Sequence, residues 1–155
     1  MGREIERKFL VVSDTWRPQV SRSIPMRQGY LCGDAHSSVR VRIAGDEAHL
    51  NIKSATLGIE RLEFEYPIPL DDARHMLGAL ARGALIEKTR HHVRHGDHLW
   101  EIDVFEGDNA GLVVAEIELE HEDEPFARPD WLGDEVSHDP RYYNNCLARH
   151  PFRDW

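Results

Sequence analysis

Charged side chains recur at every second position near the N-terminus, in a pattern that could do chemistry on phosphate groups. Glu4, Glu6 and Lys8 would share one face of a strand, because side chains alternate between the two faces of a strand. Ammonium and guanidinium groups bind phosphate oxygens through charge-assisted hydrogen bonds. Grouped carboxylates repel one another unless a cation lies between them, and oxygen ligands of this kind suit Mg²⁺ or Mn²⁺. Such a face therefore indicates binding of a polyphosphate together with a divalent metal ion.

The same spacing recurs on six later segments, where apolar residues occupy the intervening positions. The basic members of the pattern are Arg40, Arg42, Lys53, Lys88 and Arg90. The acidic members are Glu63, Glu65, Glu101, Asp103, Glu116 and Glu118. All three lysines of the chain belong to the pattern, and hardly any Ser, Thr or Gln stands among the charges. Surface strands usually mix in such neutral polar residues, so we interpret the charged faces as the lining of one cavity.

A simpler alternative explains any single strand equally well. An antiparallel sheet that covers an apolar core commonly turns a charged face to water, where acidic and basic residues aid solubility. A domain of that kind would have a structural or interaction role. The separation of the acidic strands from the basic strands favours the cavity, because an enclosed space with both clusters would place metal ions against phosphate groups.

Alternation of apolar and polar residues with a period of two predicts eight strands, joined mostly by short turns. The predicted strands cover residues 3–12, 23–32, 38–44, 47–55, 59–68, 85–94, 98–105 and 112–121. Gly45-Asp46 and His95-Gly96-Asp97 have the composition of hairpin turns, so the pairing should be antiparallel. We therefore expect a mainly β fold in which the eight strands close into a barrel.

Few helices accompany these strands. Residues 70–82 carry apolar side chains at helical spacing, with acidic residues in the first turn and Gly83 as a stop. Asp139-Pro140 would begin a C-terminal helix that runs to about Arg149, since proline is favoured at the first helical position. Both helices would flank the barrel.

Composition narrows the class of protein. The chain of 155 residues has no linker or internal repeat and fits one domain over residues 1–155. Its net charge of −9 argues against nucleic-acid binding, which needs a basic surface, and no apolar run approaches the ~20 residues of a membrane span. The charged N-terminus lacks the apolar segment of a signal peptide, and Cys32 and Cys146 read as reduced thiols. We therefore predict a cytoplasmic protein that binds neither nucleic acid nor membranes.

The complete set of motifs resembles the CYTH superfamily, the triphosphate tunnel metalloenzymes. The motifs are Glu4-Ile5-Glu6-Arg7-Lys8, Arg40-x-Arg42, Lys53, Glu63-x-Glu65, Lys88-x-Arg90, Glu101-x-Asp103 and Glu116-x-Glu118. Arg27-Gln28-Gly29-Tyr30-Leu31 and Asp139-Pro140-Arg141-Tyr142 also resemble the short bacterial members. The resemblance covers essentially the whole chain. It implies a closed eight-stranded antiparallel β-barrel whose tunnel binds a triphosphate, with a C-terminal helix that plugs or lids one mouth.

The resemblance also implies a role for each group in the tunnel. Phosphate contacts would come from Lys8, Arg40, Arg42, Lys53, Lys88 and Arg90. Metal ions, Mg²⁺ or Mn²⁺, would be held by Glu4, Glu6, Glu116 and Glu118, with contributions from Glu63, Glu65, Glu101 and Asp103. Tyr30 matches a tyrosine that accepts a proton in similar short members, and Lys8 would act with it. The segment that would form the lid departs from the family pattern at Tyr143 and near Cys146.

Three classes of function stay open on these residues. The first is a metal-dependent inorganic triphosphatase, which would release phosphate from tripolyphosphate, a small-molecule substrate. The second keeps the tunnel and changes the reaction, as in a class IV-type adenylate cyclase or a thiamine or nucleoside triphosphatase. The third is a non-catalytic module that binds polyphosphate or nucleotides, which the carboxylates disfavour because anion binding gains nothing from them. In each class the apolar outer face of the barrel would need cover from helices and a partner chain, such as a second copy in a homodimer.

Overall fold

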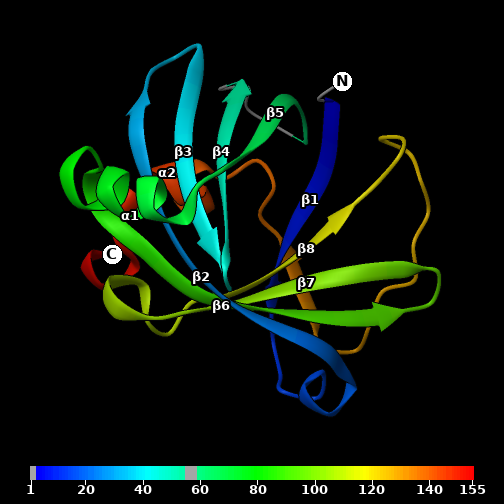
Figure 1. The fold of residues 1–155 in the computed structure, drawn as a ribbon. Helices are drawn as coiled ribbons and strands as arrows, with labels where there is room; N and C mark the ends of the chain where they lie inside the picture. The colour runs from blue at the N-terminus through cyan, green and yellow to red at the C-terminus, as the bar shows by residue number, and fades with distance from the viewer. Residues whose placement is uncertain (1–2, 55–58) are drawn as a thin grey trace.

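The computed structural model describes residues 3–54 and 59–155, and its β-sheet closes into a barrel (Figure 1). Within these residues the strands are β1 (Arg3–Val11), β2 (Val20–Gly33), β3 (Ser37–Ala44), β4 (Glu47–Ser54), β5 (Glu60–Ile68), β6 (Arg82–His95), β7 (His98–Phe105), β8 (Val113–Glu118) and β9 (Leu132–Glu135). Their order is β5-β4-β3-β2-β6-β7-β8-β1-β9, and β5 also pairs with β1. This pairing closes the strands β1 to β8 into an antiparallel ring, as predicted, and adds β9 beside β1.

Strand boundaries differ from the prediction where pairing partners, rather than local composition, decide them. β2 begins at Val20 and β6 at Arg82, each earlier than expected, because these two long strands pair with each other along most of their length. β8 ends at Glu118, short of residue 121. Alternation does not predict β9, since its four residues show no such pattern and depend on pairing with β1. The predicted end of the fourth strand at Ala55 lies outside the described residues.

The described helices are α1 (Leu70–Ala79), α2 (Asn144–Arg149) and the short 3₁₀ turns η1 (Arg17–Gln19), η2 (Gly107–Asn109), η3 (Pro140–Tyr142) and η4 (Phe152–Asp154). The single helix predicted over residues 140–149 is therefore wrong in its extent. Asp139 does cap its start by accepting a hydrogen bond from the Arg141 backbone at 3.1 Å. Tyr143, however, is extended (φ −73°, ψ 138°) and separates η3 from α2. None of the described helices combines the length and apolar character needed to cross a membrane.

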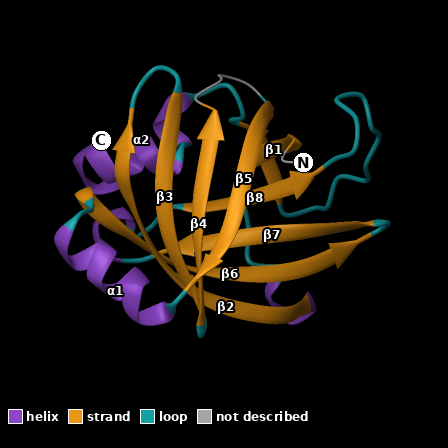
Figure 2. Ribbon diagram, turned by 45° about the horizontal axis from the view of Figure 1, so that its top comes forward, coloured by secondary structure: helices purple, strands orange, loops and turns teal. Residues whose placement is uncertain are grey.

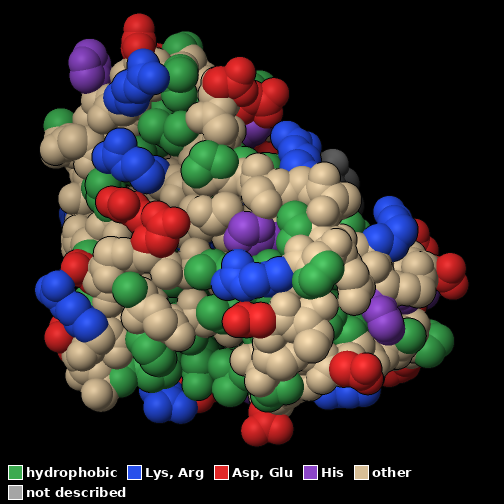
Figure 3. All heavy atoms as spheres, turned by 90° about the horizontal axis from the view of Figure 1, so that it is seen from below, with side chains coloured by type: hydrophobic (Ala, Val, Ile, Leu, Met, Phe, Trp, Pro, Cys, Tyr) green, Lys and Arg blue, Asp and Glu red, His purple; other side chains and the backbone are tan. Residues whose placement is uncertain are grey.

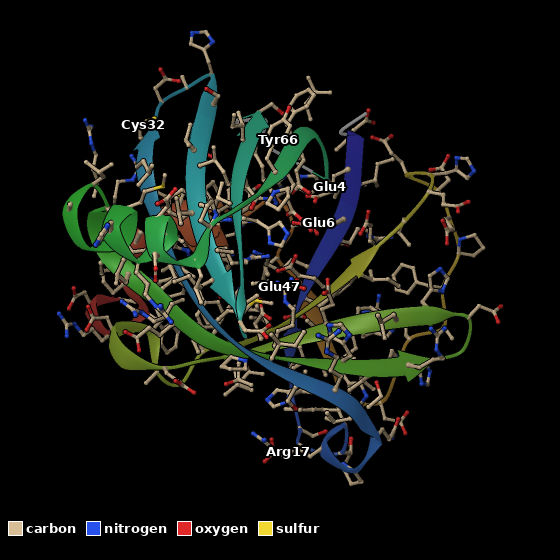
Figure 4. The ribbon with its side chains drawn as sticks, viewed as in Figure 1. Glu4, Glu6, Arg17, Cys32, Glu47 and Tyr66 are labelled. Carbon is tan, nitrogen blue, oxygen red and sulfur yellow. The ribbon has the colours of Figure 1, made fainter. Side chains whose placement is uncertain are left out.

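The charged face of β1 points into the barrel and its apolar face points outward. Glu4 and Glu6 lie on the side of β1 that faces β4 and β5 (Figure 4) and line an internal cavity together with Lys8. Ile5 and Phe9, at the alternate positions, are buried in a cluster on the outside of the wall. This direction agrees with the cavity interpretation and excludes the solvated-face alternative for β1.

Most of the hydrophobic core lies outside the barrel wall. One cluster gathers around Trp100, whose ring meets Phe9 and Trp131 edge to face with centroids 5.7 and 5.5 Å apart. Another forms where Ala73 and Leu77 of α1 pack on β3 and β4. Both helices lie at one side of the barrel near β2 and β3 (Figure 2). Helices and loops of this chain therefore provide much of the expected cover.

A third cluster closes one end of the barrel from within. Leu10, Ile86 and Val114 each stand two residues from an inward-facing charged residue of the same strand, namely Lys8, Lys88 and Glu116. They pack with Leu147 and Ala148 of α2. The interior thus changes from charged to apolar along the barrel axis, and α2 plugs the apolar end.

Part of the outer wall stays open to solvent. Leu62, Phe64 and Tyr66 occupy alternate positions of β5 and are 52%, 42% and 54% exposed. Elsewhere on the surface, in the view of Figure 3, Lys and Arg side chains alternate with Asp and Glu rather than gathering by sign. The apolar stripe on β5 is therefore the part of the wall for which a partner chain would matter.

Gly29 of β2 provides a test of how α1 packs on the barrel wall. A Cβ at this position would lie 2.9 Å from Leu85 Cδ2 and 3.0 Å from both Ala81 Cβ and Leu77 Cδ2. We expect Gly29→Val to lower the free energy of unfolding by about 1–3 kcal/mol, because α1 would be pushed off the wall. Gly78→Ala is the control, since nothing lies within 4 Å of that site and it should leave stability unchanged or slightly higher. Urea unfolding of both variants measures the difference, and a Gly29→Val variant as stable as Gly78→Ala would contradict this packing.

Candidate active site

A cavity of about 480 Å³ occupies the charged part of the barrel interior. Every residue predicted for the site except Lys88 and Asp103 lines it. The predicted residues in the lining are Glu4, Glu6, Lys8, Tyr30, Arg40, Arg42, Lys53, Glu63, Glu65, Arg90, Glu101, Glu116 and Glu118. Residues from distant parts of the chain therefore meet in one space, because the strands around the ring turn their charged faces toward the same interior.

Carboxylates face one another across neighbouring strands on one side of the cavity. Glu6 on β1 is the register partner of Glu118 on β8, and Glu116 on β8 is the partner of Glu101 on β7. Like charges directly opposite in a sheet are destabilising. A divalent cation among these oxygens would relieve the repulsion, and the donor set suits a hard cation. Among the described residues, however, no three acidic or His/Cys side chains form a preformed metal cage.

The acidic side therefore fits a metal ion in its chemistry, while its side chains do not converge on a single point. Burial raises the pKa of Glu4 from 4.5 to about 8, and the neighbouring charge of Glu6 adds to the rise. Burial and Glu116 likewise raise the pKa of Glu6. The pKa of Glu116 moves the other way: burial opposes ionisation, yet Lys8, Arg90 and Lys88 hold it well below its usual range. A bound cation would favour the ionised form of all three carboxylates.

Lys53 and Lys8 bridge the basic and acidic sides. The Nζ of Lys53 lies 3.2 Å from Glu4 and 3.0 Å from Glu63, which is its register partner on β5. The Nζ of Lys8 lies 3.9 Å from Glu116 and donates a hydrogen bond to the backbone carbonyl of Tyr142 at 3.1 Å. Both ammonium groups are therefore held by groups that a phosphate oxygen would have to join or displace.

Lys88 and Asp103 lie beneath the cavity rather than on its surface. Lys88 Nζ donates to Asp103 at 2.7 Å, and Arg90 makes two hydrogen bonds to the same carboxylate at 2.8 and 2.9 Å. Although burial opposes it, Arg90 and Lys88 lower the pKa of Asp103 to about 2. Burial lowers the pKa of Lys88 to about 7 despite Asp103. Asp103 stays ionised in either state of Lys88, because the permanently charged Arg90 shares it.

Arg40 and Arg42 differ from the other cations of the cavity in having no direct carboxylate partner among the described residues. No carboxylate lies within ion-pair distance of either guanidinium among the described residues. Arg42 Nε instead donates to the side-chain oxygen of Gln28 at 2.7 Å. Burial lowers the pKa of Arg42 to about 9, and the charges of Arg40 and Arg90 add to this. Two neighbouring cations without a direct ion-pair partner have the chemistry that suits an anion.

The structure adds lining residues that the prediction does not name. Ser38, Ser54 and Arg61 come from the strands, and Pro140, Tyr143, Asn144, Asn145 and Cys146 come from the segment around η3 and α2. Arg61 stands two residues before Glu63, so the alternation on β5 places it on the same charged face, although no role in the site is predicted for it. The C-terminal residues carry no such signal, because their position depends on how α2 enters the barrel.

We expect Asp103→Asn to lower the free energy of unfolding by about 3–5 kcal/mol, because it leaves buried Lys88 without its counterion and removes the nearest carboxylate from Arg90. Asp97→Asn in the exposed β6–β7 turn is the matched control and should change stability little. Chemical denaturation of both variants at pH 7 measures the difference. A loss in Asp103→Asn no larger than in the control would refute this account of the cavity floor.

The contribution of Glu4 to stability without metal should fall as the pH rises from 5 to 7. In this range the folded state keeps a proton on Glu4 (pKa about 8) that the unfolded state has released at its ordinary value of 4.5. The folded state therefore binds more protons, and the free energy of unfolding decreases with pH. Denaturation in EDTA at both pH values measures this slope. Glu4→Gln should flatten it, and an unchanged slope in that variant would show that Glu4 is not the group responsible.

Comparison with known proteins matches this chain to one family. The CYTH domain matches residues 2–143 of the chain. An inorganic triphosphatase of Acetivibrio thermocellus is 43% identical over 155 residues, which is 100% of this chain and 99% of that protein. An inorganic triphosphatase of Nitrosomonas europaea is 39% identical over 149 residues, covering 94% of this chain and 96% of that protein. The crystal structure of the inorganic triphosphatase NE1496 has a TM-score of 0.67 and 37% identity over 94% of this chain and 93% of its own. By fold, by tunnel and by sequence, this chain belongs to the CYTH domain family.

Proposed function

We propose that this protein hydrolyses tripolyphosphate to pyrophosphate and phosphate, with a divalent metal ion between the substrate and the acidic side of the barrel. The observation that carries the proposal is that Arg40 and Arg42 form no ion pair with a described carboxylate, in a cavity otherwise rich in carboxylates. A polyphosphate would supply the missing negative charge on one side and metal ligands on the other. Relatives named inorganic triphosphatase along the full length of the chain support this choice of substrate.

Phosphate groups would be held by the basic side of the cavity. Arg40 and Arg42 offer guanidinium donors that no carboxylate of residues 3–54 or 59–155 occupies, and Lys53 and Arg90 complete the set from either side. Lys88 has a supporting part, because its ammonium group is bonded to Asp103 and Asn144 below the lining. Removing any one of the lining cations would weaken binding, since each charge-assisted bond to phosphate is among the stronger hydrogen bonds.

The metal ion, Mg²⁺ or Mn²⁺, would be held by the acidic side. Glu4, Glu6, Glu116 and Glu118 are the proposed ligands, with Glu63, Glu65 and Glu101 at the rim of the same space. Asp103 is assigned a different role, as counterion to Lys88 and Arg90, because it is fully buried below the cavity. When bound, such an ion neutralises charge on the phosphate oxygens and makes water a better nucleophile.

The reaction needs a water molecule, a leaving group and a proton acceptor. Water would attack a terminal phosphorus in line, the bond from that phosphorus to the bridging oxygen would break, and pyrophosphate would leave with the bridging oxygen. The proton released by the water would pass to Tyr30 as the phenolate or to Lys8 as the free amine, and both side chains line the cavity. Tyr30 is the register partner of Arg40, whereas Lys8 is already engaged with Glu116 and the Tyr142 carbonyl.

The proposal also includes the cellular location and the oligomeric state of the protein. Cys32 and Cys146 are free thiols, which supports the reducing cytoplasm as its location. The exposed stripe of Leu62, Phe64 and Tyr66 supports a homodimer formed through β5. Tripolyphosphate is the only partner that the proposed reaction itself requires besides water and metal.

We expect Glu4→Gln combined with Glu6→Gln to reduce metal-dependent phosphate release by at least about 100-fold, or about 2.7 kcal/mol in activation free energy. The reason is loss of two proposed metal ligands without a change in side-chain volume. Phosphate release from tripolyphosphate, ATP and thiamine triphosphate, each with Mg²⁺, Mn²⁺ or EDTA, measures the effect. Glu87→Gln, at an exposed position of β6, is the control and should keep full activity.

Each outcome of that panel bears on the proposal. Strong metal-dependent release from tripolyphosphate alone supports it. Preference for an organic triphosphate, or conversion of ATP to a cyclic nucleotide and pyrophosphate, would replace the substrate while keeping the tunnel. An active double variant would overturn the assignment of the metal ligands. Binding without turnover of any substrate by the unaltered protein would favour a binding module instead.

A further inference from the structure

We propose that Gln28 is a positioning residue, which orients Arg42 toward phosphate while leaving the positive charge of Arg42 uncompensated. Gln28 lies on β2 below the lining of the cavity and would touch neither substrate nor metal. The inference rests on the proposed function, in that phosphate is taken as the ligand of Arg42. The inference assigns Gln28 to the site because of its hydrogen bond to Arg42 and the groups that surround this bond.

The geometry fixes one edge of the Arg42 guanidinium. Gln28 and Arg42 are register partners on β2 and β3, and the Gln28 side-chain oxygen accepts from Arg42 Nε at 2.7 Å. Gln28 is completely buried, so its amide has little freedom to turn away. Because the bond uses Nε, the terminal nitrogens of Arg42 are left to form the two-pronged contact that guanidinium makes with phosphate.

Arg90 provides the comparison within the same barrel. Its Nε edge is also held, but by the carboxylate of Asp103, which takes two hydrogen bonds at 2.8 and 2.9 Å. Asp103 places a negative charge beside the arginine that it orients, whereas the amide of Gln28 orients Arg42 without adding one. A neutral acceptor therefore leaves the charge of Arg42 for an anion, whereas Arg90 reaches the cavity with its charge already partly balanced.

Packing alone does not explain a glutamine at this position. The side-chain nitrogen of Gln28 is buried and has no hydrogen-bond partner among the residues that the structure describes. An unpartnered buried donor destabilises a fold, so an apolar side chain of similar length would suit the interior better. Ile86, the register partner of Gln28 on β6, is itself apolar and fully buried. We therefore attribute the glutamine at this position to the hydrogen bond that its side-chain oxygen accepts from Arg42.

Two variants of Gln28 separate the orientation of Arg42 from the charge next to it. Gln28→Met removes the unpartnered amide nitrogen but leaves Arg42 Nε without its acceptor, so we expect the melting temperature to change little. The KM for tripolyphosphate should increase about three- to tenfold with little change in kcat. Gln28→Glu keeps an acceptor but adds a negative charge against Arg42, so the KM should rise by more than about tenfold. Calorimetric titration of tripolyphosphate in EDTA should give parallel changes in Kd.

A double-mutant cycle tests whether Gln28 acts through Arg42. Lysine lacks the Nε edge, so Gln28→Met should have no further effect on Kd in an Arg42→Lys background, yet keep its full effect in an Arg40→Lys background. Gln19→Met at the exposed end of η1 is the control for the substitution itself.

The outcomes distinguish this inference from the proposed function. An active parent protein whose KM and Kd are unchanged by both Gln28 variants would overturn the positioning role, as would a variant that only melts earlier. Wild-type affinity in Gln28→Glu would overturn the requirement for a neutral acceptor. A parent protein that binds tripolyphosphate without hydrolysing it would refute the proposed function, and the Kd values would still decide the role of Gln28.

Discussion

Charge buried inside the barrel governs how the rest of this protein is built. An ionised group removed from water needs an opposite charge or hydrogen bonds, or it destabilises the fold. Lys88, Arg90 and Asp103 satisfy this requirement among themselves below the cavity. With the interior so occupied, the apolar faces of the strands point outward, and the core forms around Trp100 and beneath α1 on the outside of the wall.

The two ends of the barrel consequently differ. Inward positions that are charged near the cavity become apolar at Leu10, Ile86 and Val114, where α2 is inserted. The segment before α2 is tied to Lys8 through the Tyr142 carbonyl, and the first residue of α2, Asn144, is tied to Lys88. The position of the plug and the geometry of the cavity are therefore linked by the same side chains.

Cations inside the barrel fall into two kinds according to what holds them. Lys53 and Arg90 are held by carboxylates, so their charge is largely balanced before any ligand arrives. Arg42 is held by a neutral amide, and neither it nor Arg40 has a carboxylate partner among the described residues. The unbalanced charge concentrates on β3, opposite the acidic strands, which is an arrangement suited to a ligand that carries both phosphate and metal.

The order of residues along the chain is enough to establish which of them share a face. Because side chains alternate with a period of two, the charged faces of β1, β3, β5 and β8 can be identified from residue spacing alone, and the closed barrel follows from eight such strands. This spacing predicts nearly all of the residues that line the cavity from the strands. Arg61 could have been added to them on the same ground.

The depth of each of those residues, and the groups that hold it, are set by tertiary structure. Asp103 lies two residues after Glu101 and therefore on the same face of β7. The register with β6 nevertheless places it against Lys88 and Arg90 below the lining. Gln28 is a neutral residue in a charged pattern and acquires its role only because β2 pairs with β3. The extent of α2 and the presence of β9 likewise depend on contacts with distant strands. Local alternation fixes the direction of a side chain, whereas depth and partners follow from the pairing of strands far apart in the chain, which no short window of sequence contains.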